Sequence, residues 1–371
     1  MLLVGQAPPP YGGQAVMIEQ ALRGQYDNTE IFFVRMAFAR EFRGAGRPSL
    51  RKALHLVALV ARIAVARLRR RTTVLYFPPS GAERLPMYRD LVLLLCIRWM
   101  FATTIFHFHA GGVSELYPEL RPWVRPLFRR AFFHPDVAIR TSRAAPEDGL
   151  ALLAAREFVI PNGVEDAAAR APEEWFAERD AGDPRILFVG LLRESKGVFV
   201  LLDACRELRA RGVPFRLELM GEFHSATIAD RVRAAIGDPH LGGRVTWLGA
   251  LAGEDKDRAY ARASVLAYPT FFESETFGLV LVEAMQFGLP VVASAWRGVT
   301  TVVEEGVNGH LVPVRDSQAL ADRLETLLRD PALRRRLGDA GRRRYESCYT
   351  LGRFHHELGT VFAALQAEGV R

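Results

Sequence analysis

Short β-favouring runs alternate with helical patterns along the second half of this chain, and this alternation is the strongest constraint on its fold. The run "RILFVG" at 185–190 precedes the helical pattern at 197–212, and "FRLELMG" at 215–221 precedes the pattern at 226–237. The runs "RVTWLG", "VLAYPT" and "PVVAS" continue the series, with helical patterns between them. Strands that alternate with helices form parallel βαβ units. We therefore predict an α/β fold with doubly wound parallel sheets.

The first half shows the same alternation less clearly. We expect strands near "LLVG", "EIFFV", "TVLYF", "TTIFHF", "VAIRT" and "FVIPN". A chain of 371 residues is long enough for two domains, each with its own core. Residues 161–184 are loop-like and rich in Pro, Gly and Asp, as a connection between domains would be. The predicted domains are therefore residues 1–165 and 166–371, with the last helix as a candidate to pack back on the first domain.

The cysteines and the first residues indicate the compartment. Cys96, Cys205 and Cys348 are widely spaced and odd in number, which favours neither a disulfide framework nor a CxxC metal site. The opening "MLLVGQAPPPYGG" has no basic start and only a short apolar run, so it does not resemble a signal peptide. We predict a cytoplasmic protein.

The most apolar stretch of the chain is "LVLLLCIRWMFATTIFHF" at 91–108. It is interrupted by Arg98, and its second part consists of β-favouring residues. A membrane-spanning helix needs about 20 predominantly apolar residues. The stretch therefore predicts a buried helix followed by a buried strand, and not a span.

Positive charge is concentrated in the first half. Residues 1–165 carry 22 Lys and Arg against 13 Asp and Glu, whereas residues 166–371 carry 27 against 29. The segment at 48–71 concentrates this charge: Arg51, His55, Arg62 and Arg69 adjoin an apolar stripe at helical spacing, which consists of Leu50, Leu54, Val57, Ala61, Ala64 and Leu68. Such a helix either lies on an anionic membrane or is a surface helix whose apolar stripe faces the core.

In doubly wound sheets, ligands bind at the carboxyl ends of strands. Gly12 and Gly13 follow the first expected strand and precede the helical pattern "QAVMIEQAL", so their amides could approach a phosphate. The loop does not match GxGxxG, and no acidic residue in the second strand is placed for a ribose. A dinucleotide dehydrogenase is therefore poorly supported.

A lysine follows the first strand of the second domain. Lys196 and Gly197 lead into a helical pattern, and Lys52, Lys196 and Lys256 are the only lysines of the chain. A compact ammonium suits a phosphate as a point charge, where an arginine would bring a wider planar group. A phosphate-binding lysine is the functional reading, and a chance surface lysine is the alternative.

The stretch "ESETFGLVLVEAMQFGLPVV" at 273–292 places acidic residues in an apolar setting. Glu283 lies in a predicted buried helix and needs a partner, because a buried carboxylate loses its water. An arginine of a neighbouring helix or a position at the rim would satisfy it. Alternatively, Glu283 binds a ribose diol, and Glu275 binds sugar hydroxyls beside a diphosphate at the helix N-terminus. We expect the first turn of that helix to consist of Thr276, Phe277 and Gly278.

At these residues the sequence resembles the retaining glycosyltransferases of family 4, also called glycosyl transferases group 1. The signature is a Glu, seven residues and a second Glu, here Glu275 and Glu283. Further matches are Gly12-Gly13, "FHFHAGG", "VIPNGVE" with Asn162 and Gly163, and "SKG", so that the resemblance spans nearly the whole chain. It implies the GT-B fold, in which two Rossmann-like doubly wound domains face each other across a cleft.

The resemblance also implies roles for single residues. Glu275 would bind the donor sugar, Glu283 the ribose and Lys196 the diphosphate. His109 would line the reaction centre, with His107 on the same face of the strand as its competitor. A core histidine is the structural alternative for both.

Two positions depart from the family pattern. The family often has a diphosphate-binding Arg at the position of Leu191, and Arg193 is a candidate to substitute for it. The glycine-glycine-acid loop of the family is here "WRGVTTVVEEG", in which Gly298 and Thr300 could keep backbone contacts while the acidic residue is missing.

The function implied is transfer of a hexose-type sugar, with retention, from a UDP- or GDP-sugar to a saccharide or lipid-linked acceptor. The process would be assembly of cell-surface polysaccharide or glycolipid, at the inner face of the membrane. No metal or cofactor beyond the nucleotide-sugar is implied, and no nucleic acid is expected. The alternatives are a nucleotide-sugar epimerase of the same fold, a basic nucleic-acid-binding protein and an inactive GT-B scaffold.

Overall fold

The computed structural model describes residues 1–9, 12–36 and 50–367, without the side chains of residues 50–53 and 180. These residues form two compact units. Unit 1 consists of Met1–Asn162, Glu273–Phe277 and the described part of Leu351–Arg371. Unit 2 consists of Gly163–Phe272 and Gly278–Thr350.

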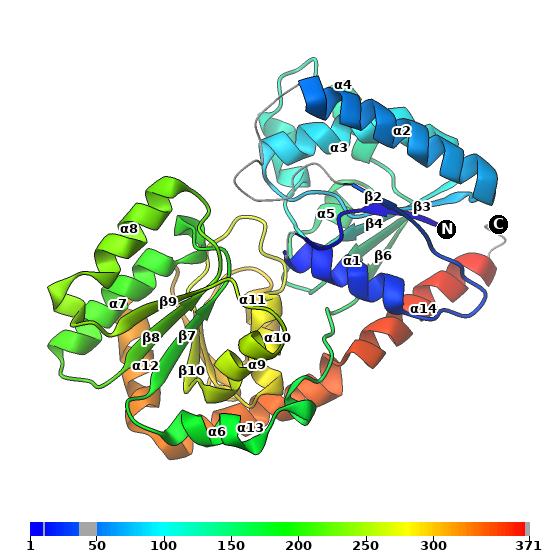
Figure 1. Cartoon of the computed structure of the whole chain (residues 1–371). Helices are drawn as coiled ribbons and strands as arrows, with labels where there is room; N and C mark the ends of the chain where they lie inside the picture. Colours follow the sequence, from blue (N-terminus) through cyan, green and yellow to red (C-terminus); the bar gives the residue numbers. More distant parts are fainter. Residues whose placement is uncertain (10–11, 37–49, 368–371) are drawn as a thin grey trace. The chain divides into compact units, whose positions relative to one another are not determined.

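Unit 1 is built on a six-stranded parallel sheet with the order β2-β1-β3-β4-β5-β6 (Figure 1). The strands are β1 (Leu2–Gly5), β2 (Phe32–Arg35), β3 (Val74–Phe77), β4 (Thr103–Phe108), β5 (Val137–Arg140) and β6 (Arg156–Val159). All six strands expected in this half are present, and β6 lies two to three residues earlier than "FVIPN" predicted.

Helices cover both faces of this sheet, because alternate strand residues point to opposite sides. One face packs against α2 (Leu50–Arg70), α3 (Arg84–Ile97) and α4 (Arg125–Phe132), which lie side by side in Figure 1. The other face meets α1 (Gly13–Arg23) and α14 (Leu351–Ala367), where Tyr76 of β3 contacts Phe362 and His107 of β4 contacts Phe354. The short helix α5 (Asp148–Ala151) precedes β6.

The rotation of α2 decides between the two alternatives for its apolar stripe. Leu59 and Ile63 are the α2 side chains buried against the sheet, and Arg67 Nε donates to the Met100 carbonyl at 3.0 Å. The apolar stripe that the sequence pattern identified is exposed. Its residues Leu54, Val57, Ala61 and Leu68 face solvent. Ala64 is half-buried, and the side chains of Leu50 and Arg51 lie outside the described part. Of the two alternatives for this stripe, the structure contradicts packing against the core, because a second apolar stripe of α2, with Leu59 and Ile63, takes that position.

The apolar stretch at 91–108 forms the end of α3, one 3₁₀ turn and β4, as predicted. Among the described residues, no helix is long and apolar enough to cross a membrane.

Unit 2 has a second six-stranded parallel sheet, with the order β12-β11-β10-β7-β8-β9. The strands are β7 (Arg185–Val189), β8 (Arg216–Met220), β9 (Val245–Gly249), β10 (Val265–Tyr268), β11 (Val291–Ser294) and β12 (Gly309–Val312). The core of one face includes side chains of α7 (Val198–Ala210), α8 (Ala226–Ile236) and α12 (Ser317–Arg329). The remaining helices are α6 (Glu173–Ala177), α9 (Gly253–Arg262), α10 (Leu279–Gln286), α11 (Val299–Val302) and α13 (Pro331–Cys348).

The strand orders locate one ligand-binding edge in each unit. The chain winds outward from β1 to β2 and then returns to β3, so that the order reverses between β1 and β3. In unit 2 the same reversal lies between β7 and β10. Loops at the carboxyl ends of the strands beside such a switch point diverge and leave a crevice for a ligand. The loops after β1, β3, β7 and β10 are therefore the first places to look for a site.

Candidate functional site

The loop after β1 leads into α1 with an open glycine backbone. Gly12 caps α1 and Gly13 is its first residue, as expected for a phosphate-approaching loop. A Cβ at Gly13 would meet nothing within 4 Å, so no described neighbour requires glycine there. Arg35 at the end of β2 holds the start of this loop, because it donates to the carbonyls of Ala7, Pro8 and Pro9 at 2.9, 2.8 and 3.0 Å.

Two stacked histidines stand at the end of β4. The ring centroids of His107 and His109 are 3.8 Å apart, and the Tyr76 hydroxyl forms a hydrogen bond with Nδ1 of His107. Burial lowers the pKa of His109 to about 3, although Asn162 opposes the shift. Burial and the neighbouring His109 also hold the pKa of His107 well below its usual value. Both rings are therefore neutral at neutral pH. His107 is the more deeply buried, and His109 lies at the strand end beside the glycine loop.

A buried carboxylate fixes the glycine loop that follows His109. Asp148 accepts hydrogen bonds from the amides of Gly112 and Ser114 at 2.7 and 2.8 Å, and from the Ser114 hydroxyl at 2.7 Å. Burial raises the pKa of Asp148, and the bonds from Ser114 and Gly112 oppose this rise. Sequence reasoning missed Asp148, and the only available signal was an acidic residue at the start of a short helical pattern.

Residues 273–277 pack in unit 1 around His109. The Thr276 hydroxyl donates to the His109 carbonyl at 2.8 Å, and the Ser142 hydroxyl donates to the Thr276 carbonyl at 2.8 Å. Ser274 Oγ accepts from the Ala82 amide at 2.8 Å. Glu275 lies between these two anchored residues and is itself buried. Unit 1 thus brings together Glu275, Thr276 and His109, three of the predicted site residues.

The helix after this segment begins later than predicted. Thr276, Phe277 and Gly278 do not form its first turn, because α10 begins at Leu279. Gly278 has φ +83°, a left-handed conformation that is outside a helix. Glu283 consequently lies one turn inside α10.

Two predicted cations meet at one aromatic ring in unit 2. The Arg193 guanidinium and the Lys196 ammonium each lie 4.7 Å from the centroid of Phe272. Lys196 Nζ also lies 3.2 Å from the Tyr268 hydroxyl. These residues belong to the loops after β7 and β10, the strands beside the switch point of this sheet. The structure therefore places both charges at the ligand-binding edge of unit 2.

Gly197 allows this loop to close. It has φ +80°, and a Cβ there would lie 2.0 Å from the Pro269 carbonyl oxygen. Only glycine fits, and the loop after β7 can then approach the end of β10.

Glu283 has two partners that sequence reasoning did not identify. Lys256 Nζ lies 2.9 Å from one carboxylate oxygen, and the Tyr260 hydroxyl donates to the other at 2.7 Å. Both belong to α9, one turn apart. A lysine and a tyrosine therefore take the place of the arginine that was one of the alternatives, and the rarity of lysine in the chain was the available signal. The role of Glu283 as a ribose ligand stays a prediction.

The loop after β11, which departs from the family pattern, contacts the same segment as Arg193 and Lys196. The Trp296 indole donates to the Phe272 carbonyl at 2.8 Å, so the loop supports the segment that the two cations contact. Gly298 caps the short α11, and the Thr300 hydroxyl donates to the Arg297 carbonyl at 2.9 Å. The substitution of Arg193 for the arginine missing at Leu191 stays a prediction.

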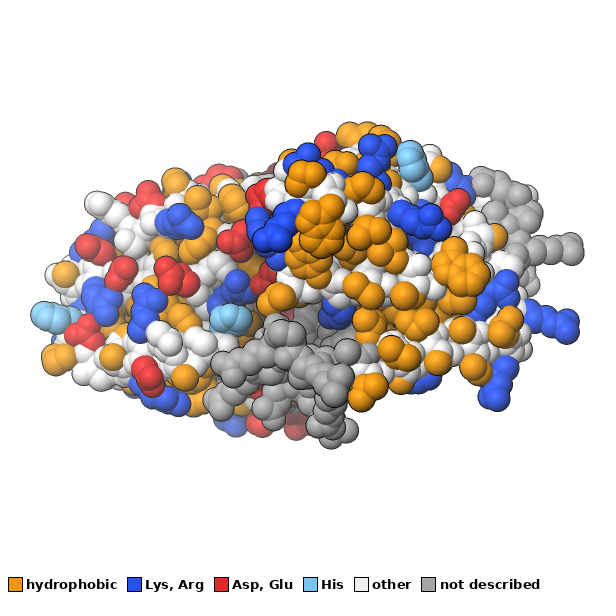
Figure 2. Space-filling view, turned by 90° about the horizontal axis from the view of Figure 1, so that it is seen from above, with side chains coloured by type: hydrophobic (Ala, Val, Ile, Leu, Met, Phe, Trp, Pro, Cys, Tyr) orange, Lys and Arg blue, Asp and Glu red, His pale blue; other side chains and the backbone are white. Residues whose placement is uncertain are grey.

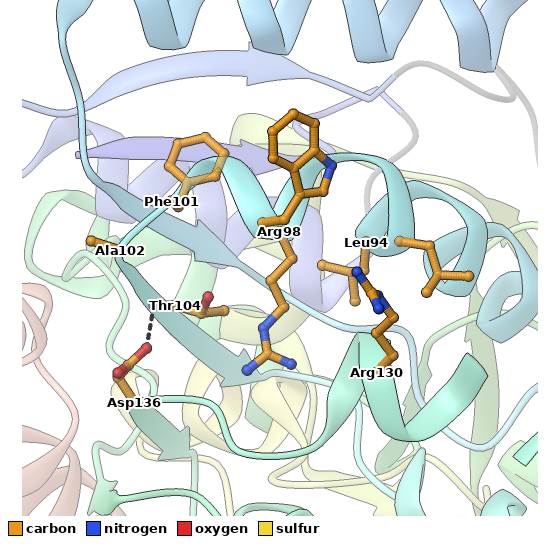
Figure 3. A pocket seen from close by; sticks show the side chains of 9 residues that line it. Leu94, Arg98, Phe101, Ala102, Thr104, Arg130 and Asp136 are labelled. Carbon is orange, nitrogen blue, oxygen red and sulfur yellow. Dashed lines mark hydrogen bonds between the residues drawn. The ribbon is translucent and has the colours of Figure 1, made fainter. Parts of the chain in front are cut away.

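Two pockets lie away from these edges. One of about 340 Å³ lies near the amino ends of β4 and β5, where Asp136 accepts from the Thr104 amide at 2.7 Å (Figure 3). Another of about 590 Å³ lies between α7 and α8. Because ligands of such sheets bind at the carboxyl ends of the strands, we do not assign either pocket to the candidate site. In the described part of the chain, no group of three or more His, Cys, Asp or Glu side chains is arranged to hold a metal.

Comparison with known proteins finds a family match over part of the chain. The family model "Glycosyl transferases group 1" matches residues 170–344. The chain is 36% identical over 243 residues to the phosphatidyl-myo-inositol mannosyltransferase of Mycobacterium leprae, covering 63% of this chain and 59% of that protein. It is 33% identical over 262 residues to the putative colanic acid biosynthesis glycosyltransferase WcaL of Salmonella typhimurium, covering 68% and 60%. The chain thus spans about 60% of the length of these two relatives.

Solved structures show the fold. Sucrose-phosphate synthase from Thermosynechococcus elongatus superposes with a TM-score of 0.79 at 21% identity, covering 99% of each chain. Anabaena HepE in complex with UDP-glucose gives a TM-score of 0.74 at 20% identity, covering 98% of this chain and 99% of that one. Two parallel sheets with this likeness confirm the predicted GT-B fold with two Rossmann-like units.

Proposed function

We propose, from the match of residues 170–344 to the glycosyl transferases group 1, that the chain belongs to this family and is a retaining hexosyltransferase that uses a UDP- or GDP-sugar. The observation that carries the proposal is the pair of cations, Arg193 and Lys196, at one ring beside the switch point of unit 2. Two positive charges there suit a diphosphate, whose negative charge grows as the sugar leaves. No metal ion is needed for this step.

The proposed chemistry retains the configuration at the anomeric carbon. The acceptor hydroxyl attacks the anomeric carbon from the face of the leaving group, while the bond from that carbon to the diphosphate oxygen breaks. The proton of the hydroxyl passes to the diphosphate. Lys196 and Arg193 stabilise the charge on the diphosphate, and Glu283 binds the ribose.

Unit 1 supplies neutral and acidic groups for the sugar. His109 is uncharged at neutral pH because its pKa lies near 3, so it serves as a hydrogen-bond partner and not as an acid. Glu275, held between anchored neighbours, binds hydroxyls of the donor sugar. The amides of Gly12 and Gly13 bind phosphate oxygens.

We propose a saccharide or lipid-linked acceptor, in assembly of cell-surface polysaccharide or glycolipid on the cytoplasmic side of the membrane. The names of the relatives support this class, since they include a phosphatidyl-myo-inositol mannosyltransferase and a colanic acid biosynthesis glycosyltransferase. The excess of positive charge in residues 1–165 suits an anionic acceptor or its carrier.

Thermal unfolding with a panel of UDP, GDP, ADP, CDP and their sugars tests the proposal. A nucleoside diphosphate at a hundredfold excess over its dissociation constant adds about 2.7 kcal/mol of stability, which raises the melting temperature measurably. The base that gives the largest shift identifies the donor. No shift with any compound would contradict the proposal and favour an inactive scaffold.

Variants assign the parts of the site. Lys196→Ala is expected to reduce the rise in melting temperature with every nucleoside diphosphate. Glu275→Gln is expected to reduce only the additional rise that the sugar of a nucleotide-sugar contributes. Arg231→Ala is the matched control, because Arg231 also stacks on an aromatic ring of unit 2, that of Phe199 at 3.7 Å. NMR of the product gives its anomeric configuration, and an inverted product would exclude the retaining mechanism.

A further inference from the structure

Exposed apolar side chains are concentrated on one helical layer of unit 1. Sixteen large hydrophobic side chains of the described residues are exposed, and ten belong to α2, α3, α4 or the turns beside them. Figure 2 shows hydrophobic side chains gathered over this layer, with arginines among them and at its margins. The ten are Leu54, Val57, Val65, Leu68, Leu85, Tyr88, Val92, Trp99, Trp123 and Leu127.

These side chains form stripes and are not scattered. Along α2 the exposed residues follow helical spacing from Leu54 to Leu68, although Leu59 and Ile63 already supply the core face. α3 is apolar on both sides: Leu91 and Leu94 are buried, whereas Leu85 and Val92 face outward. A helix that is apolar all round is normally covered on all sides. No described part of the chain covers the outer stripes.

The same layer is strongly basic. Within their bounds, α2 carries six Lys and Arg, α3 two and α4 three. The single acidic residue of these helices is Asp90, which is buried and accepts hydrogen bonds from the Ser80 amide and from Arg89. The exposed face of the layer is therefore cationic as well as apolar.

We propose that the outer face of α2, α3 and α4 docks on an anionic phospholipid bilayer. Apolar side chains bury in the interface while arginines meet the lipid phosphates, which is the composition of helices that lie on membranes. A second copy of this chain would bring two cationic faces together, and like charges oppose that contact. Trp99 and Trp123, 72% and 67% exposed, suit the boundary between headgroups and acyl chains.

Arginines line the pocket beside Trp99. Arg98 and Arg130 reach it from the turn after α3 and from α4 (Figure 3). Arg98 is fixed there, because it donates to the carbonyls of Ala131, Phe133 and His134 at 2.8, 2.7 and 2.6 Å. Arg98 therefore holds the turn that carries Trp99, and the exposed Arg130 is the cation available to a lipid phosphate beside the indole.

Co-sedimentation of the full chain with vesicles tests the proposal. We expect binding to vesicles of equal parts phosphatidylglycerol and phosphatidylcholine, weak binding to phosphatidylcholine alone, and loss of binding as salt rises. Leu68→Ser should lower the partition coefficient about tenfold. Leu150→Ser is the matched control, since Leu150 is 65% exposed and Leu68 71% exposed in the same unit. Equal loss in both variants would overturn the proposal.

Charge reversal provides a second arm. Each arginine near an anionic surface contributes about 1 kcal/mol, or about fivefold in partition, so Arg62→Glu with Arg69→Glu should reduce binding well over tenfold. Arg335→Glu with Arg336→Glu makes the same change of charge at exposed positions of unit 2. This pair should leave vesicle binding within about twofold of that of the native chain, because long-range charge effects are screened by salt. Similar losses with both pairs would overturn the docking surface.

Fluorescence locates the contact. Brominated lipids should quench the tryptophan emission of the native chain, and Trp99→Phe with Trp123→Phe should remove most of that quenching. A dimer in the absence of lipid that Leu68→Ser dissociates would overturn the bilayer in favour of a second copy. The proposal is independent of sugar transfer. The change in melting temperature with nucleoside diphosphates tests that function separately.

Discussion

Glu283 shows how far reasoning at the residue scale extends. Its position in an apolar helix correctly implied a partner, because a carboxylate is not buried alone. The identity of that partner was not predictable, since Lys256 and Tyr260 lie on α9, more than twenty residues away in the sequence. The pairing of α9 with α10 depends on the sheet order, which the sequence does not state.

The Glu283 cluster is expected to stabilise unit 2. Glu283→Gln removes the opposite charge from Lys256 and should lower the free energy of unfolding by about 1–3 kcal/mol at pH 8. Glu283 is the main cause that raises the pKa of Lys256. The stabilisation is therefore complete below the ordinary lysine pKa and is lost as pH rises through the raised value. Urea unfolding at pH 8 and at alkaline pH measures both effects.

Ribose binding by Glu283 is a separate question. If it is a ligand, Glu283→Gln weakens binding of every nucleoside diphosphate in calorimetric titration, whereas Tyr260→Phe, which keeps the carboxylate, weakens it much less. Unchanged affinity in a folded Glu283→Gln variant would assign the carboxylate to structure alone.

His109 makes stability depend on pH. Its folded pKa of about 3 lies below the usual histidine value, so the unfolded chain binds a proton more readily. Stability is therefore unaffected above neutral pH and falls as pH drops below about 6.5. At pH 5 the loss from His109 is about 2 kcal/mol. Urea unfolding at pH 7 and pH 5 should show a smaller loss for His109→Gln than for the native chain, and an equal loss would contradict this account.

At the scale of elements, the alternation of strands and helices was sufficient to predict the architecture. Eleven of the twelve described strands lie at or within a few residues of the β-favouring runs that predicted them, because parallel strands are short, apolar and separated by helical patterns. The twelfth, β12, was not predicted. Which face of α2 is buried was not predictable, since two apolar stripes satisfy helical spacing equally well. The start of α10 was missed because Gly278 adopts a left-handed conformation that composition alone does not reveal.

Gly197 provides a test of the loop after β7. Gly197→Ala would place a Cβ 2.0 Å from the Pro269 carbonyl oxygen and should both lower the melting temperature and weaken diphosphate binding by displacing Lys196. Gly212→Ala is the control, because Gly212 also has a positive φ but meets nothing within 4 Å. It should show only the left-handed strain of about 1–2 kcal/mol, with normal binding. Equal effects in the two variants would remove the steric argument.

At the scale of the whole molecule, unit 1 is assembled from segments that lie far apart in the sequence. His355 of α14 lies 2.8 Å from the Gln20 carbonyl, and Tyr26 packs edge-on against Phe362. Residues 273–277 join the same unit through Ser274 and Thr276. Local sequence patterns do not encode such separations. The last helix was a candidate to pack back on the first domain, whereas residues 273–277 were expected in the second domain.

Removal of α14 should affect the two units differently. Phe354, Leu358 and Phe362 are buried in unit 1, so a chain that ends at Thr350 exposes the face of the sheet that carries Tyr76 and His107. Limited proteolysis should then cut unit 1 rapidly and spare fragments of unit 2. Uniform resistance in both units would contradict this role of α14.

Because unit 1 includes segments from distant parts of the chain, its folding depends on the order in which they are synthesised. Its sheet is made from strands between Leu2 and Val159, but the face that α1 covers in part is completed only by α14, which begins at Leu351. At a translation rate of about 5–20 residues per second, the part of this face that α14 covers is exposed for roughly 10–40 seconds. Unit 2 needs no residue beyond Thr350 and can complete itself first. The part of the chain that is made first is therefore finished last, and it is the part a chaperone would meet.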